Sequence, residues 1–146
     1  MKFNFSYILY IFLFFSFFHS VSSVLNRDTK QFGRQFLVDN DEETCWNSDS
    51  ASEQFIICNF KQIKTLNKII IQFQGGFSSK KIILQFFDQN KTILRESILY
   101  PNDNNLLQEF YDFEAVPASS IKLLLTDLSD MFGRVIVYHL ELFALE

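Results

Sequence analysis

Runs of apolar and β-branched residues alternate with short polar breaks along most of this chain. The pattern is typical of β-strands, in which successive side chains point to opposite faces of a sheet. Eight runs are expected to form strands, at residues 21–26, 53–60, 66–74, 80–88, 91–100, 107–113, 119–127 and 134–145. Eight mostly antiparallel strands without a substantial helix predict an all-β fold, a single two-sheet sandwich or jelly roll, which limits exposed sheet edges.

Residues 69–81 organise the rest of the chain. This stretch begins as a β-branched apolar run and reaches the pair Gly75-Gly76, after which Phe77 follows directly. A glycine pair at the end of a strand indicates a tight exit or a bulge. We therefore expect a core strand whose end reaches a functional rim. The alternative is a tight turn with two solvated amides, Gln72 and Gln74.

The last predicted strand carries two different faces. One face is apolar apart from a tyrosine and is expected to lie in the core, whereas the other mixes apolar and polar side chains. The expected core face consists of Ile136, Tyr138, Leu140, Leu142 and Ala144, and the mixed face of Val135, Val137, His139, Glu141 and Phe143.

The segment before these strands has a different pattern. Residues 27–39 combine charges with apolar residues at helix-like spacing, and Gly33 argues against a long helix, so one or two helical turns are expected. Residues 39–43 form an acidic loop that lacks the glycine and the distal glutamate of an EF-hand, so a solvated loop is preferred to a calcium site. Trp46 is expected to pack over one end of the core.

The N-terminus divides the chain into a leader at residues 1–20 and one domain at residues 21–146. Lys2 precedes an apolar run of about twelve residues, and small residues follow at Ser20 and Ser22, as in a signal peptide. A membrane-spanning helix needs roughly twenty apolar residues, so no stable membrane span is expected. The leader is therefore either a signal peptide or a divergent extension.

Two cysteines and one glycosylation motif bear on the question of export. Cys45 and Cys58 could form a disulfide in an oxidising compartment, but their spacing does not require it. Asn90 begins an Asn-Lys-Thr motif that would be glycosylated only in an exported chain.

Charge and motif content exclude several classes of function. Outside the leader the chain has twelve basic and seventeen acidic residues, so direct binding of nucleic acid is not expected. His139 is the only histidine outside the leader. The sequence contains no glycine-rich phosphate loop, no metal-ligand cluster and no Gly-x-Ser-x-Gly motif. We therefore expect no catalytic residues, no metal site and no cofactor, and we do not expect an enzyme.

Five blocks of sequence resemble the nuclear receptor subfamily 2 group C member 2-associated protein family. These blocks lie at residues 21–27, 31–33, 41–49 and 72–79, and at 132–135 together with 138–140. The resemblance implies a galactose-binding-like (discoidin-like) jelly roll, in agreement with the strand count. It also implies a non-enzymatic protein of the nucleus or cytoplasm that associates with an orphan nuclear receptor and represses transactivation by it. The apolar leader departs from this family, and a working signal peptide would instead direct the chain to the secretory pathway.

Discoidin domains hold sugars, lipids or proteins with loops at one end of the sandwich, and residues 44–46 and 134–143 are similar to matching parts of those domains. We expect the corresponding rim here to dock a protein partner, with Arg134 as a charged anchor and Phe77 or Phe132 as an apolar plug. The expected rim consists of Trp46, Asn47, Ser48, Gln74, Gly75, Gly76, Phe77, Phe132, Gly133 and Arg134.

Two alternatives remain for these rim residues. In a secreted or cell-surface lectin-like module, Trp46 or Phe77 would stack on a carbohydrate while Asn47, Gln74 and Arg134 bind its hydroxyl groups. In a purely structural reading, Trp46 and Phe132 cap the core and Arg134 pairs with a carboxylate of the acidic loop.

Overall fold

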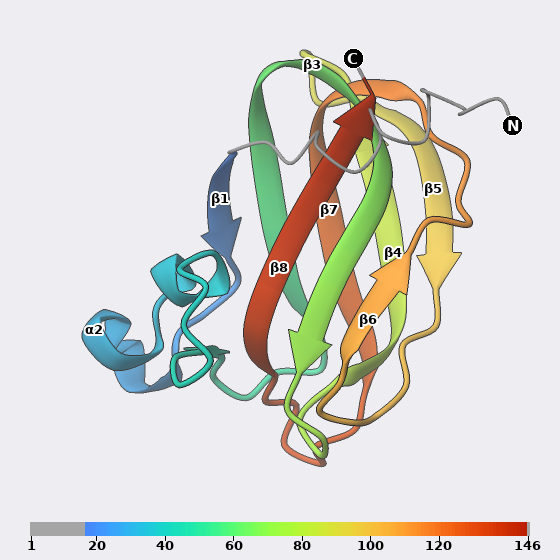
Figure 1. Cartoon of the computed structure of the whole chain (residues 1–146). Helices are drawn as coiled ribbons and strands as arrows, with labels where there is room; N and C mark the ends of the chain where they lie inside the picture. Colours follow the sequence, from blue (N-terminus) through green and yellow to red (C-terminus); the bar gives the residue numbers. More distant parts are fainter. Residues whose placement is uncertain (1–16, 146) are drawn as a thin grey trace, which may run out of the picture.

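Two antiparallel sheets packed face to face form residues 17–145, the part of the chain that this computed structural model describes (Figure 1). One sheet contains β1 (Phe18–Val21), the first half of β3 (Gln54–Phe73), β7 (Pro117–Leu128), β4 (Ser79–Phe87) and β5 (Ile93–Leu99). The other contains β2 (Trp46–Asn47), β8 (Ile136–Leu145), the second half of β3 and β6 (Leu107–Phe110). The predicted all-β jelly-roll sandwich is confirmed.

Strand β3 belongs to both sheets, where two separate strands were expected. Its first half pairs with β7 up to Asn59, the register shifts before Lys64, and its second half pairs with β8 from Thr65 onward. Figure 1 shows the ribbon turning over the upper end of the sandwich. The polar stretch at residues 61–64 bends without breaking the strand, so the two predicted runs are one element.

The expected strand at residues 21–26 is wrong. Strand β1 ends at Val21, and Leu25–Arg27 forms a 3₁₀ turn (η1) in which Asn26 has a φ of 53°. A positive φ is incompatible with an extended strand. The predicted helical turns are confirmed by α2 (Thr29–Phe32) and the 3₁₀ helix η2 (Arg34–Leu37).

The two predicted faces of β8 are only partly correct, because a β-bulge interrupts its alternation. Gln72 pairs with His139, but the next β3 residue, Phe73, pairs with Val137, so Tyr138 is an extra residue. A single inserted residue exchanges the two faces of a strand. Val137 therefore points into the core before the bulge, although it was assigned to the mixed face. Leu140 is buried after the bulge, as expected.

The start of the sandwich lies inside the stretch that was expected to be a leader. Strand β1 begins at Phe18 and pairs with β3 through Val21, which lies opposite Ile56. The prediction for residues 1–16 lies outside the described part of the chain. Within the described part, no helix is long and apolar enough to cross a membrane.

Candidate functional site

Three segments that are distant in sequence meet at the lower end of the sandwich in Figure 1. The backbone of Ile136, at the start of β8, joins them. Its N–H donates to the Phe77 carbonyl at 3.0 Å, and its carbonyl accepts from Gln74 N–H at 3.0 Å. Asn47 of β2 pairs with the same residue. The structure thus brings the three predicted rim segments together, and we call this end of the molecule the rim.

Arg134 connects these segments through its side chain. Its Nη2 donates to Asn47 Oδ1 at 3.2 Å, and its guanidinium carbon lies 5.3 Å from the centre of the Phe77 ring. A cation above an aromatic face is attracted by the negative charge of that face. No carboxylate of the acidic loop pairs with Arg134 among the described residues, so the structural reading of Arg134 is wrong. Its Nε is buried with no hydrogen-bond partner in the described part of the chain.

Three of the predicted rim residues are buried beneath its surface, namely Trp46, Asn47 and Ser48. The Trp46 side chain has 0% exposure and donates through Nε1 to the Ser23 carbonyl at 2.8 Å. The Ser48 hydroxyl accepts from the Val135 N–H at 2.8 Å. Trp46 therefore caps the core, and its ring is closed to a sugar or a partner in this structure.

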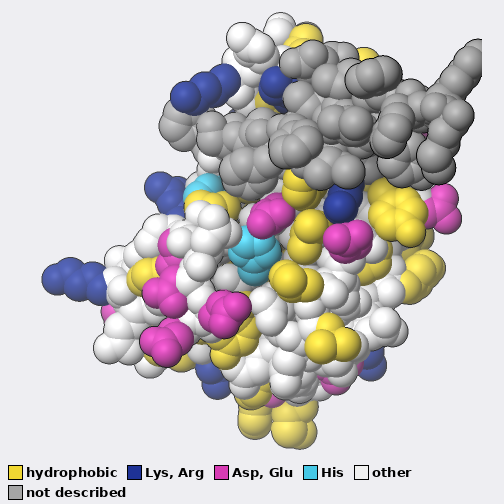
Figure 2. Space-filling model, in the orientation of Figure 1, with side chains coloured by type: hydrophobic (Ala, Val, Ile, Leu, Met, Phe, Trp, Pro, Cys, Tyr) yellow, Lys and Arg dark blue, Asp and Glu magenta, His cyan; other side chains and the backbone are white. Residues whose placement is uncertain are grey.

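The outermost rim residues are Met131 and Phe132, in the loop between β7 and β8. Met131 is 88% exposed and Phe132 is 68% exposed, so Phe132 does not cap the core. Figure 2 shows apolar side chains projecting from the lower end of the molecule. Phe132 was predicted for the rim from sequence and Met131 was not, because a single methionine in a loop carries no signal of its own. Two large exposed apolar side chains side by side are typical of a contact surface.

Two of the three rim glycines, Gly76 and Gly133, have a positive φ but different surroundings. Gly76 has a φ of +85° and is exposed, and a Cβ added to it would meet nothing within 4 Å. Gly133 has a φ of +77°, and an added Cβ would lie 1.5 Å from the Ala51 carbonyl oxygen. Gly133 is therefore required by the close approach of residue 51 as well as by its own backbone conformation.

Two side chains that gave no signal in the sequence, Asp103 and Asn105, form a clamp that fixes the glycine turn. Asp103 Oδ1 accepts from the Gly76 N–H at 2.8 Å and from the Ser78 hydroxyl at 2.7 Å, while Asn105 Oδ1 accepts from the Gly75 N–H at 2.5 Å. The Gly76 N–H, followed by the Ser78 hydroxyl, lowers the pKa of Asp103 below its ordinary value. Because protonated Asp103 is a weaker acceptor, the clamp weakens as the pH falls through that lowered pKa.

Gln54 is a second support that the sequence did not reveal. Its Oε1 accepts from the hydroxyls of Ser22 and Ser23 at 2.5 and 3.0 Å. Its Nε2 donates to the carbonyls of Asp49 and Gly133 at 2.7 and 3.0 Å. This amide, 1% exposed, ties the end of β1 to the rim loop. Glutamine at the start of a strand gives no signal by itself, because its partners come from three other segments.

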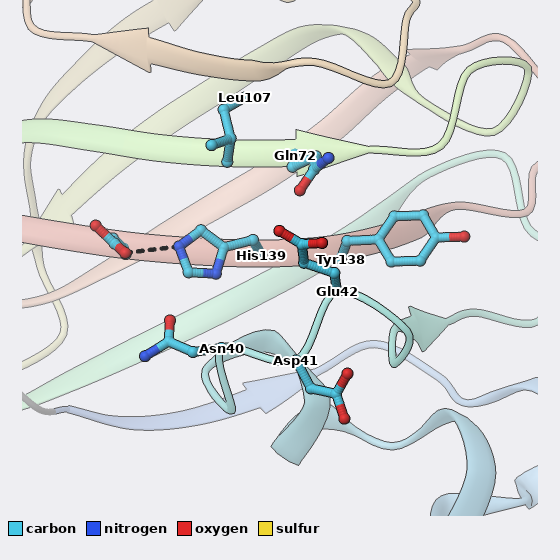
Figure 3. A pocket seen from close by; sticks show the side chains of 8 residues that line it. Asn40, Asp41, Glu42, Gln72, Leu107, Tyr138 and His139 are labelled. Carbon is cyan, nitrogen blue, oxygen red and sulfur yellow. Dashed lines mark hydrogen bonds and ion pairs between the residues drawn. The ribbon is translucent and has the colours of Figure 1, made fainter.

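A polar groove of about 210 Å³ lies on the outer side of the second sheet, and one of its lining residues, Tyr138, donates through its hydroxyl to Oε1 of the rim residue Gln74 at 2.9 Å. Figure 3 shows the acidic-loop residues Asp41 and Glu42 on one side of His139 and Gln72 on the other. His139 Nε2 lies 2.7 Å from Glu141 Oε1. Among the described hydrogen bonds of its ring there is none to a hydroxyl or a thiol.

Neither metal binding nor a disulfide is indicated by the described residues. No group of three or more His, Cys, Asp or Glu side chains in residues 17–145 is arranged to hold a metal ion. In the acidic loop, Asp39 and Asp41 accept backbone N–H groups two residues ahead, at 3.1 and 2.9 Å. Cys45 and Cys58 are both free thiols, so the disulfide considered for an exported chain is not formed.

Comparison with solved structures shows the same fold in carbohydrate-binding and F5/8 type C domains. A Clostridium perfringens module solved with GalNAc-β-1,3-galactose is 18% identical, with a TM-score of 0.72 over 88% of this chain and 95% of that module. An F5/8 type C domain from Bacteroides fragilis is 12% identical, with a TM-score of 0.71 over 88% and 91%. At these identities the likeness establishes the galactose-binding-like fold and nothing further.

Comparison with curated proteins gives much closer relatives, although no family model matches the chain. The nuclear receptor 2C2-associated protein of Homo sapiens is 45% identical over 121 residues, which cover 83% of this chain and 86% of the human protein. The Danio rerio protein of the same name is 43% identical over 122 residues, covering 84% and 86%. Identity of this extent over most of both chains shows that this chain belongs to the nuclear receptor 2C2-associated protein family.

Proposed function

We propose that this chain is a non-enzymatic interaction module that binds a nuclear receptor of the 2C2 kind through its rim and represses transactivation by that receptor. The names of the relatives supply the kind of partner. The observation that carries the rim as the contact surface is the exposure of Met131 and Phe132 beside the Arg134–Phe77 pair. This role would place the chain in the nucleus or cytoplasm.

The rim offers the chemistry that stabilises protein interfaces. Phe132 and Met131 supply apolar area, and burial of a large apolar side chain contributes about 1.5–3 kcal/mol. Arg134 is held by Asn47 and Phe77, so little conformational entropy is lost when it contacts a partner. Its Nε has no hydrogen-bond partner in the described part of the chain. The Asp103 clamp holds the neighbouring glycine turn in one conformation.

The test measures binding of the purified chain to purified human nuclear receptor 2C2 by biolayer interferometry. Phe132→Ser is expected to weaken binding at least tenfold, about 1.4 kcal/mol, because it removes the exposed ring. Tyr111→Ser is the matched control, because Tyr111 is also 68% exposed but lies outside the rim. If wild type does not bind, the receptor assignment fails, and if both variants bind like wild type, the rim assignment fails.

A carbohydrate ligand is the second candidate, favoured by the likeness to modules solved with GalNAc-β-1,3-galactose and with galactose. Phe77, Gln74 and Arg134 are partly exposed and can contact such a ligand, whereas Trp46 is buried. Galactose is added at millimolar concentration while backbone amide shifts of the rim are followed by NMR. Saturable shifts at Gln74, Phe77 and Arg134 would support the sugar candidate, and unchanged shifts would leave the protein-binding proposal.

A further inference from the structure

Strand β1 has one free edge. It pairs with β3 and with no other strand among residues 17–145. The Ser22 N–H donates to the Phe55 carbonyl at 3.0 Å, and Ser20 pairs with Ile57 two positions earlier. Because alternate residues of an antiparallel strand face its partner, the N–H and C=O groups of His19 and Val21 point to the opposite edge. Among the described residues, these backbone groups have no hydrogen-bond partner.

Two hollows lie beside β1, and the smaller one also reaches Asn59 of β3. One hollow of about 450 Å³ is lined by Ser20, Val21 and the basic side chains Lys30 and Arg34, together with neighbouring residues of α2 and η2. A second hollow of about 380 Å³ shares Ser20 and Arg34 and continues past His19. His19 Nε2 lies 2.9 Å from the Arg34 carbonyl, which joins η2 to β1. We call the two hollows together the β1 groove.

The β1 groove is basic although the chain is acidic. No Asp or Glu lines either hollow. Lys30 and Arg34 form no ion pair with any residue of the described part of the chain. The chain as a whole has thirteen basic and seventeen acidic residues. Figure 2 shows both Lys or Arg and Asp or Glu side chains on this flank of the molecule, so the absence of acidic groups holds for the lining of the two hollows and not for the whole flank. Unneutralised cations beside a concave surface favour an anionic partner.

We propose that the β1 groove binds an extended, acidic segment of a partner protein by strand addition. The segment pairs its backbone with His19 and Val21, the two residues with outward hydrogen-bonding groups. Its Asp or Glu side chains contact Lys30 and Arg34. Backbone pairing at a sheet edge provides affinity, and side-chain contacts provide specificity.

This proposal does not depend on the receptor-binding rim. No residue that lines the β1 groove belongs to the rim, so the two surfaces do not overlap. The N-terminal residues 1–16 of the chain contain no Asp or Glu. They lack the negative charge that Lys30 and Arg34 require, so a separate acidic segment is the better match.

The experiment uses the whole chain, isotope-labelled for NMR, and a blocked hexapeptide in which Glu and Val alternate. We expect saturable shifts of the His19 and Val21 amides, and at least tenfold weaker binding of a hexapeptide that alternates Lys and Val. Arg34→Glu should weaken binding of the acidic peptide at least tenfold. Lys91→Glu, the same charge change at the exposed turn between β4 and β5, should leave it unchanged.

A second variant separates strand addition from simple attraction of an anion. Val21→Pro removes an N–H that faces the groove and leaves the groups that pair with β3, so the variant should fold but bind the peptide at least tenfold more weakly. Equal binding by Val21→Pro, equal shifts with free glutamate, or no shift at His19 and Val21 would each overturn the proposal. If Val21→Pro does not fold, the Arg34→Glu and Lys91→Glu pair and the free-glutamate titration decide the question.

Discussion

At the scale of single residues, hydrogen-bond partners decided roles that residue type alone left open. Trp46 and Arg134 were both predicted for the rim from sequence. In the structure Trp46 is fully buried, whereas Arg134 lies at the rim and packs on Phe77. Asp103 lies between two predicted strands and shows no role in the sequence, but it accepts two hydrogen bonds from the glycine turn. A side chain shows its type in the sequence, whereas its partners are set by segments far along the chain.

Gly76 and Gly133, the two rim glycines with a positive φ, give a prediction at this scale. Gly133→Ala should destabilise the fold by more than about 3 kcal/mol, because its Cβ would lie 1.5 Å from the Ala51 carbonyl oxygen and its φ is +77°. Gly76→Ala is the control, where only the positive φ costs energy, about 1–2 kcal/mol. Guanidinium unfolding measures both free energies. Equal midpoints for the two variants would show that residue 51 moves aside at little cost.

At the scale of elements, hydrophobic patterning located most strands but not their continuity or register. The runs at residues 53–60 and 66–74 join as β3, because a strand can bend through a polar stretch and change sheets. The bulge at Tyr138 exchanges the faces of β8, and it arises from pairing with β3, which one strand's alternation does not contain. The first strand was predicted at residues 21–26, but β1 is Phe18–Val21. The prediction began too late because the apolar residues before Val21 were assigned to a leader.

Strand β1 is expected to be a structural part of the sandwich. A chain that begins at Ser23 should be less stable than one that begins at Phe17 by about 2–4 kcal/mol, from several lost hydrogen bonds of about 1 kcal/mol each. It loses the pairing with β3 and the Ser22 hydroxyl that bonds Gln54. Both chains lack residues 1–16, so the comparison isolates β1. Urea unfolding provides the measurement, and identical midpoints would show that β1 is dispensable.

At the scale of the whole molecule, the two thiols report on the integrity of the sandwich. Cys58 is 0% exposed, and burial raises its pKa far above the ordinary value of a thiol. Cys45 is half-buried, and burial also raises its pKa, but its side chain is accessible from solvent. Because the thiolate is the reactive form, access and pKa together determine how fast each cysteine is alkylated.

Iodoacetamide should therefore modify Cys45 slowly in the native protein and Cys58 only when the sandwich unfolds. Raising the pH should accelerate the reaction of Cys45, because more of it becomes thiolate, while Cys58 stays protected by the core. Mass spectrometry of the adducts measures both rates, and Cys45→Ser gives a protein in which Cys58 alone is followed. Native labelling of Cys58 at the rate of Cys45 would contradict a single closed core.

The sequence by itself determined the all-β class, most strand positions, the segments that form the rim and the family, because these depend on local patterning and on blocks of residues that can be compared directly. Only the tertiary structure decided that Trp46 is closed to a ligand, that Met131 projects beside Phe132, and that β1 leaves a basic groove along a free edge. Exposure and unpaired edges depend on which segments pack together, and packing is a property of the folded chain.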